Sequence, residues 1–182
     1  MLNKNVMLQL LTASRLLLGV LFFVWEYYFG LVADYIVVAV LILTFLEVSD
    51  ALDGYIARKY GLVSNFGKVF DPYTDSISRL LIYFSLSFHG YVWLLVPIVM
   101  AIRDVTVSYS RIVLVQNNQN PAARLSGKLK AVFQGVGAFT SILLPLLFPA
   151  FIEYYPAGIS IMVISVTAWS TYHYVRDAIK SL

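Results

Sequence analysis

Six long apolar stretches constrain the fold of this chain more than any other feature. A helix needs about 20 mostly apolar residues to cross a bilayer. The stretches are Leu8–Tyr28, Val32–Val48, Ile77–Phe88 with its polar lead-in, Val92–Val115, Ala131–Phe151 and Ala157–Tyr174. The third is long enough only if its helix begins before Asp75, which we expect. The sequence therefore predicts an all-α integral membrane protein with six transmembrane helices.

The composition excludes an ordinary water-soluble domain. Of the 182 residues, 60% are hydrophobic and only 13% are charged, whereas soluble domains carry roughly 25% charged residues. The chain has no cysteine, which excludes disulfides, thiolate metal sites and cysteine nucleophiles. Internal repeats and low-complexity segments are absent from the sequence. We therefore expect a single membrane domain over residues 1–182.

The distribution of basic residues predicts the topology. All of the 13 lysines and arginines except Arg79 and Arg103 fall at the termini or in the 49–76 and 111–130 regions, on one side of the six stretches. By the positive-inside rule, both termini and these two regions are cytoplasmic. The net charge of +3 is thus explained by orientation in an inner or plasma membrane, and we expect no nucleic-acid partner.

Four aspartates, Asp50, Asp53, Asp71 and Asp75, lie at the cytoplasmic ends of the second and third stretches. A charged residue at membrane depth costs about 2.5–3.5 kcal/mol on insertion scales, so such residues are usually functional. Spacings of three and four place each pair on one helix face. Four converging carboxylates repel one another unless they are protonated or bridged by metal. Oxygen ligands favour two Mg²⁺ or Mn²⁺ ions, and a two-metal site favours phosphoryl-type displacement.

The same residues carry a family resemblance. The pattern Asp50-x-x-Asp53-Gly54-x-x-Ala57-Arg58, eight residues, Gly67, three residues, Asp71, three residues, Asp75 resembles the signature of the CDP-alcohol phosphatidyltransferases at every fixed position. The signature block spans residues 50–75.

This resemblance implies a homodimer of six-helix chains, with two divalent metals at a cytoplasm-facing site and CDP-diacylglycerol as the substrate. It also implies that Asp50, Asp53, Asp71 and Asp75 hold the metals and that Asp75 serves as the general base. Gly54 and Ala57 would accommodate the cytidine, and Arg58 would lie beside the nucleotide. A role for Asp75 in metal ligation alone stays open.

A group of basic residues later in the chain bears on the acceptor. Arg103 and Arg111 are about two helical turns apart, and Lys128 and Lys130 open the fifth stretch. Together these four side chains predict a pocket for an anionic group, because guanidinium groups recognise phosphate through a planar fork of donors. A small phosphorylated alcohol is therefore favoured over choline, ethanolamine or serine. Alternatively, Arg103 has a structural role only, in which the neighbouring Asp104 neutralises its charge.

This basic pattern resembles the phosphatidylglycerolphosphate synthase branch of the family, whose acceptor is sn-glycerol 3-phosphate. Thr12 and Arg15 also resemble that branch, in which Thr12 would approach the nucleotide. Gln9, Ser76 and Ala131 depart from the branch, where Asn, Lys and Thr are usual. Inositol phosphate, an amino alcohol or a membrane lipid such as phosphatidylglycerol stay open as acceptors.

Other interpretations concern single residues and the protein class. Arg79 follows Asp75 by four residues and can pair with it, either as a counter-ion or as a substrate contact. Glu47 precedes Asp50 by three residues and is interpreted as a partner of the acidic cluster or as an interfacial residue. A transporter would place its charges near the midplane, and a prenyltransferase would carry its aspartates on two separated segments.

Overall fold

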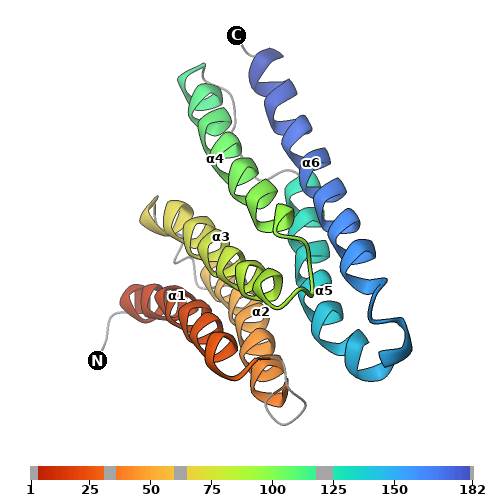
Figure 1. The fold of residues 1–182 in the computed structure, drawn as a ribbon. Coiled ribbons are helices and arrows are strands. Elements are labelled where there is room, and N and C mark those ends of the chain that lie inside the picture. Colours follow the sequence, from red (N-terminus) through yellow and green to blue (C-terminus); the bar gives the residue numbers. More distant parts are fainter. Residues whose placement is uncertain (1–3, 31–35, 60–64, 118–124, 181–182) are drawn as a thin grey trace. The chain divides into compact units, whose positions relative to one another are not determined.

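The computed structural model is built from α-helices, with no strand among the described residues 4–30, 36–59, 65–117 and 125–180. The helices are α1 (Lys4–Phe29), α2 (Ile36–Lys59), α3 (Asn65–Phe88), α4 (Leu95–Gln116), α5 (Leu125–Leu147) and α6 (Tyr155–Lys180), with a short 3-10 helix η1 (Pro149–Phe151) before α6 (Figure 1). The predictions of an all-α chain and of a third helix that begins before Asp75 are confirmed.

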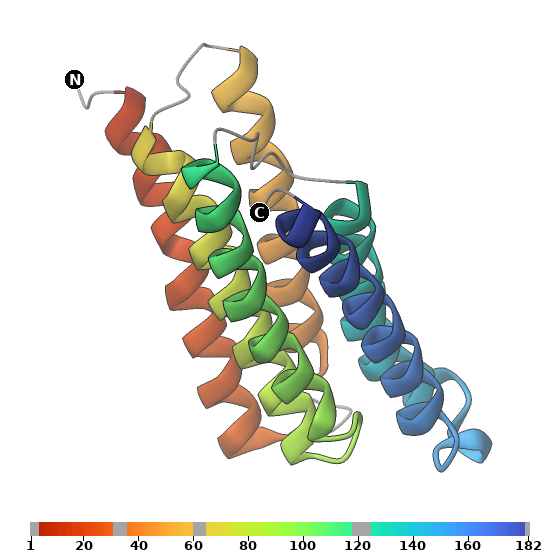
Figure 2. The same cartoon turned by 90° about the horizontal axis from the view of Figure 1, so that it is seen from above.

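The chain forms two compact units, residues 1–85 and 86–182. In the first unit, α1, α2 and α3 run alternately in opposite directions, as Figure 2 shows. In the second unit, α4 and α6 run in the same direction and α5 runs opposite to them (Figure 2). Helix α6 packs against both α4 and α5. The expectation of one domain over residues 1–182 stays a prediction.

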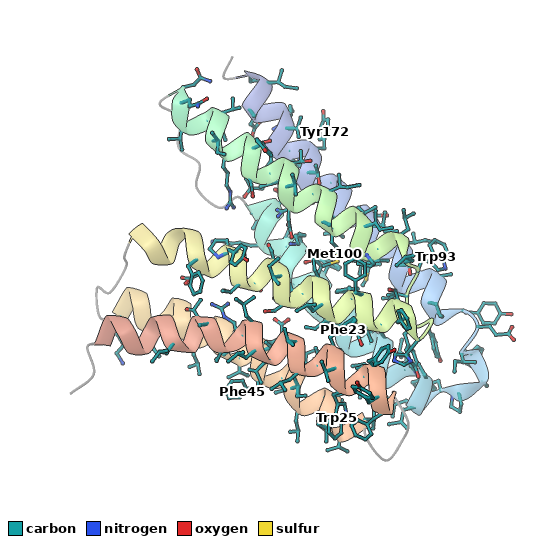
Figure 3. The ribbon with its side chains drawn as sticks, turned by 60° about the vertical axis from the view of Figure 1, so that its left-hand side comes forward. Phe23, Trp25, Phe45, Trp93, Met100 and Tyr172 are labelled. Atoms are coloured by element: carbon teal, nitrogen blue, oxygen red, sulfur yellow. The ribbon has the colours of Figure 1, made fainter. Side chains whose placement is uncertain are left out.

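The helices bury a number of polar side chains beside their apolar core and leave many large apolar side chains exposed. Buried polar residues in the first unit include Thr12, Ser78 and Arg79, and those in the second include Arg103, Gln134, Ser141 and Thr167. Exposed apolar or aromatic residues include Leu17, Phe45, Trp93, Ile102 and Tyr172, three of which are labelled in Figure 3. Large exposed apolar surfaces mark contact with a membrane or another apolar partner. This distribution agrees with a membrane protein.

One helix of the described residues, α5, is long and apolar enough to cross a membrane by length and composition, and the apolar part of α2, Ile36–Ser49, is shorter. Charged residues interrupt the apolar character of other helices. Asp71, Asp75 and Arg79 lie within α3, and Arg103 and Asp104 lie within α4. The described residues thus form six α-helices. That all six cross the membrane, and which side each end faces, stay predictions.

Close contact between α1 and α3 depends on a glycine. A Cβ atom added at Gly19 would lie 3.0 Å from the Cα atom and 3.2 Å from the Cβ atom of Ser78. The Ser78 hydroxyl donates to the Arg15 carbonyl oxygen at 2.9 Å and to the Thr74 carbonyl oxygen at 2.8 Å. Small residues let helix backbones approach closely in membranes. This contact positions α1 beside the part of α3 that carries Asp71 and Asp75.

We expect Gly19→Ala to destabilise the first unit, because the added methyl group forces α1 and α3 apart. Overpacking costs about 1–3 kcal/mol, which exceeds the gain of about 1 kcal/mol from replacing a helical glycine by alanine. Thermal unfolding of the purified protein in detergent should show a Tm lower by about 2–4 °C. Gly158→Ala is the matched control, since a Cβ atom there meets no atom within 4 Å. Equal Tm values for the two variants would contradict this account of the packing.

Candidate functional site

The four predicted metal-binding aspartates lie on two consecutive helices of the first unit. Asp50 and Asp53 belong to the last turns of α2, and Asp71 and Asp75 belong to the first half of α3. The expectation that each pair lies on one helix is confirmed. The side chains of Asp50, Asp53, Gly54, Ala57 and Arg58 lie outside the described residues, so their roles stay predictions.

Asp71 is approached by a hydroxyl from α1. The Thr12 Oγ1 atom donates to the Asp71 Oδ1 atom at 3.3 Å, and Thr12 is only 1% exposed. The structure therefore joins Thr12, which was predicted to contact the nucleotide, to one of the predicted metal ligands. A hydrogen bond to one oxygen restricts the rotation of the carboxylate, so Thr12 orients the Asp71 side chain. The nucleotide contact of Thr12 stays a prediction.

Asp75 lies in a chain of charges that runs from α3 to α2. The Arg79 Nε atom is 2.9 Å from the Asp75 Oδ1 atom. The other two guanidinium nitrogens face Glu47, with Nη1 2.8 Å from Oε1 and Nη2 3.0 Å from Oε2. The predicted pairing of Arg79 with Asp75 is confirmed, and Glu47 is the second partner of the same guanidinium. Sequence spacing along α3 could not predict that second contact, because Glu47 and Arg79 belong to different helices.

The described side chains fit a hard cation in their chemistry. Asp71 and Asp75 are one turn apart on α3, so they present carboxylate oxygens on one helix face, and oxygen ligands are those preferred by Mg²⁺ and Mn²⁺. Among the described side chains, no group of three or more acidic, histidine or cysteine residues is assembled. Two of the four predicted ligands, Asp50 and Asp53, are outside that set.

In the second unit, a buried ion cluster joins α4, α5 and α6. The Arg103 Nη1 atom is 2.7 Å from the Asp104 Oδ1 atom, and Arg103 Nη2 donates to the Ser170 hydroxyl at 3.1 Å. The Lys130 Nζ atom lies 3.5 Å from the same Asp104 oxygen. The structure thus brings together Arg103 and Lys130, two of the predicted acceptor-binding residues, and the alternative pairing of Arg103 with Asp104 is also present.

Arg111 is joined to this cluster through Tyr174, a residue that sequence reasoning missed. The guanidinium carbons of Arg103 and Arg111 lie 5.6 Å and 5.4 Å from the centre of the Tyr174 ring. Arg111 Nη2 also donates to the Tyr174 hydroxyl at 3.4 Å. Cations are attracted to the face of an aromatic ring, so the buried ring of Tyr174 keeps both guanidinium groups in place. Nothing in the sequence distinguishes it from the other 12 tyrosines.

The cluster has an excess of positive charge and unused donors. Arg103 and Lys130 both contact the Asp104 carboxylate, and Arg111 adds a third cation on the Tyr174 ring. The Nε atoms of both arginines are buried and have no hydrogen-bond partner within the described residues. Buried polar groups normally find a partner, so this arrangement is suited to an anion that accepts from guanidinium donors. Lys128, the fourth predicted member, is exposed on the first turns of α5.

The profile of the CDP-alcohol phosphatidyltransferase family matches residues 6–171. The chain belongs to this family. The resemblance carried by residues 50–75 is therefore confirmed. Members of this family generally depend on divalent metal ions, in agreement with the oxygen ligands that the aspartates offer.

Individual relatives agree with this assignment. A CDP-diacylglycerol–glycerol-3-phosphate 3-phosphatidyltransferase of Mycoplasma genitalium is 39% identical over 90 residues, which cover 50% of this chain and 38% of that protein. The enzyme of the same name from Treponema pallidum is 32% identical over 59% of this chain and 50% of its own length. The chain thus spans at most half the length of these two relatives. The enzyme of that name from Aquifex aeolicus is 32% identical over 69% of this chain and 68% of its own length.

The contact between Gly127 and Tyr174 provides a test of the cluster. A Cβ atom at Gly127 would lie 3.1 Å from the Tyr174 hydroxyl oxygen, so we expect Gly127→Ala to lower the free energy of unfolding by about 1 kcal/mol. In a Tyr174→Phe background the hydroxyl is gone, and the same substitution should cost at least about 0.5 kcal/mol less. Unfolding of the four proteins in detergent measures this coupling. Additive effects of the two substitutions would show that they do not touch.

Proposed function

We propose that this protein transfers the phosphatidyl group of CDP-diacylglycerol to a hydroxyl of sn-glycerol 3-phosphate, which yields phosphatidylglycerol phosphate and CMP. The observation that carries the proposal is the complete family signature from Asp50 to Asp75, located on α2 and α3 of a chain that belongs to this family. The names of the relatives from three bacterial species favour glycerol 3-phosphate as the acceptor.

In the proposed reaction, Asp50, Asp53, Asp71 and Asp75 hold two divalent ions, Mg²⁺ or Mn²⁺. When bound, these ions neutralise charge on the pyrophosphate of CDP-diacylglycerol. Thr12 keeps the Asp71 carboxylate in one orientation through its hydroxyl. The family resemblance implies that Gly54 and Ala57 accommodate the cytidine and that Arg58 lies beside the nucleotide.

Asp75 is the proposed general base. The acceptor hydroxyl oxygen attacks the phosphorus that bears the diacylglycerol, and its proton passes to the Asp75 carboxylate. A new oxygen–phosphorus bond forms while the bond to CMP breaks, so the phosphatidyl group moves and CMP leaves with the electron pair. A carboxylate placed within reach of the hydroxyl makes this attack easier. Asp75 is suited to the role because Arg79 fixes one of its oxygens on α3.

The acceptor phosphate is proposed to bind at the basic cluster of the second unit. Arg103 and Lys130 provide buried positive charge, Arg111 adds a half-buried guanidinium, and Lys128 adds an exposed ammonium group on α5. The unpartnered Nε atoms of the two arginines support an anionic acceptor over an amino alcohol. Inositol phosphate and phosphatidylglycerol satisfy the same chemistry and are the alternative acceptors.

The proposed setting is the inner or plasma membrane, with six spans, both termini and the active site on the cytoplasmic side, and two chains in a homodimer. The apolar outer surfaces of the helices and the one-sided distribution of lysine and arginine support the membrane setting. The family resemblance supports the homodimer.

The proposed reaction is tested by CMP release from purified protein with CDP-diacylglycerol and Mg²⁺. The acceptor panel is glycerol 3-phosphate, inositol phosphate, serine and phosphatidylglycerol. We expect release with glycerol 3-phosphate, at least tenfold above the others and abolished by EDTA. Asp75→Asn, which is isosteric, should reduce release at least about 100-fold, in the range typical of a lost general base. Release with another acceptor would overturn the acceptor assignment, and no release from folded protein would overturn the reaction.

Arg111→Lys tests the acceptor pocket separately. Lysine keeps the charge but loses the planar fork and the stacking on Tyr174, so the KM for glycerol 3-phosphate should rise about tenfold while the KM for CDP-diacylglycerol stays within twofold. Steady-state kinetics with each substrate varied in turn give both values. An equal rise in both KM values would argue against an acceptor site at Arg111. The matched control is Arg176→Lys, because the Arg176 side chain on α6 is 41% exposed and pairs with its chain neighbour Asp177 at 3.0 Å.

A further inference from the structure

The guanidinium of Arg79 connects two carboxylates on different helices. Glu47 on α2 engages both of its terminal nitrogens in a bidentate pair, at 2.8 Å and 3.0 Å. The remaining Nε atom points to Asp75 on the preceding turn of α3, at 2.9 Å. Every nitrogen of the guanidinium therefore has an acidic acceptor.

The contact with Glu47 determines the orientation of the Arg79 guanidinium. A bidentate pair fixes the plane of a guanidinium as well as its position, so Glu47 determines where the Nε–H group points. That group in turn fixes the Oδ1 atom of Asp75. Arg79 is 6% exposed, whereas the side chains of Glu47 and Asp75 are 36% and 26% exposed, so the guanidinium is enclosed by protein between two half-buried carboxylates. A change at Glu47 is thus transmitted to Asp75 through one rigid side chain.

Glu47 also lies on the helix that carries Asp50 and Asp53, one turn before Asp50. The Glu47–Arg79 pair therefore links the two helices that bear the acidic signature, close to where the signature begins on α2 and ends on α3. A salt bridge needed only for stability could join these helices at any level. The Glu47–Arg79 pair instead continues to Asp75, the proposed general base.

We propose that Glu47 and Arg79 are positioning residues that hold the Asp75 carboxylate in its working orientation, with Glu47 acting from α2 through the Arg79 guanidinium. This inference rests on the proposed function, because it assigns a purpose to the orientation of Asp75. Neither residue needs to touch the substrate.

The test uses Glu47→Gln, which keeps the shape of the side chain but loses the charge and one acceptor oxygen. We expect kcat for CMP release to fall at least tenfold, with the KM values for CDP-diacylglycerol and glycerol 3-phosphate within twofold of the unmodified protein. Mn²⁺ binding, followed by the electron paramagnetic resonance signal of the free ion, should weaken at least threefold. Folded Glu47→Gln protein with unchanged kcat or unchanged Mn²⁺ affinity would overturn the proposal.

A charge-reversed pair separates positioning from simple stabilisation. In the double variant Glu47→Arg/Arg79→Glu, the ion pair between α2 and α3 can form again, but a carboxylate replaces the cation beside Asp75. We expect the double variant to recover Tm relative to Arg79→Glu alone and to stay at least tenfold below the unmodified protein in kcat. Recovery of kcat together with Tm would overturn the proposal, because it would show that only the link between the helices matters.

Two control measurements, on the unmodified protein and on Asp75→Asn, distinguish a failure of the positioning proposal from a failure of the proposed function. If the unmodified protein releases no CMP with any acceptor, the proposed function fails and the kinetic comparison has no baseline. If the unmodified protein is active and Asp75→Asn weakens Mn²⁺ binding, Asp75 belongs to the metal site as proposed, and the Glu47→Gln result then decides the positioning role alone. Arg176→Lys, at the half-buried Arg176–Asp177 pair on α6, should leave kcat and Mn²⁺ affinity unchanged.

Discussion

The structure depends on how an apolar chain accommodates buried charge. An unpaired charge is costly in a membrane or a protein interior, and four cations of the described helices have acidic or aromatic partners. Arg79 is held by Asp75 and Glu47, Arg103 and Lys130 share Asp104, and Arg111 contacts Tyr174. These pairs connect neighbouring helices whose outer faces are apolar. The same charge contacts therefore hold the helices together and fix the positions of the candidate site residues.

Much of the fold could be predicted from the sequence because helix period and apolar length act locally. The spacing of Asp71 and Asp75 required a helix through the polar lead-in of the third stretch, and α3 does begin at Asn65. Arg79 was likewise predicted to reach Asp75 from its four-residue spacing along that helix. These predictions succeed because both partners belong to one element, so no knowledge of tertiary packing is needed.

Contacts between different helices could not be predicted from the sequence. Glu47 and Arg79 are 32 residues apart, and Thr12 and Asp71 are 59 apart, so no periodicity relates them. Tyr174 was missed for the same reason, because its role comes from the two arginines of α4 that face it from another helix. Lys128 and Lys130 illustrate the converse. Two residues apart on a helix, they point in different directions, and one is exposed whereas the other is 4% exposed and paired with Asp104.

The two units have opposite charge balances. In the first unit, two carboxylates share the single guanidinium of Arg79, and Asp71 adds a third carboxylate, so negative charge is left over. In the second unit, Arg103 and Lys130 share the carboxylate of Asp104 and Arg111 contacts Tyr174, so positive charge is left over among these four charged residues. A surplus of carboxylate attracts divalent cations, and a surplus of guanidinium attracts phosphate. In the proposed reaction, the carboxylates of the first unit would hold the metal that neutralises the donor pyrophosphate, and the basic side chains of the second unit would hold the acceptor phosphate.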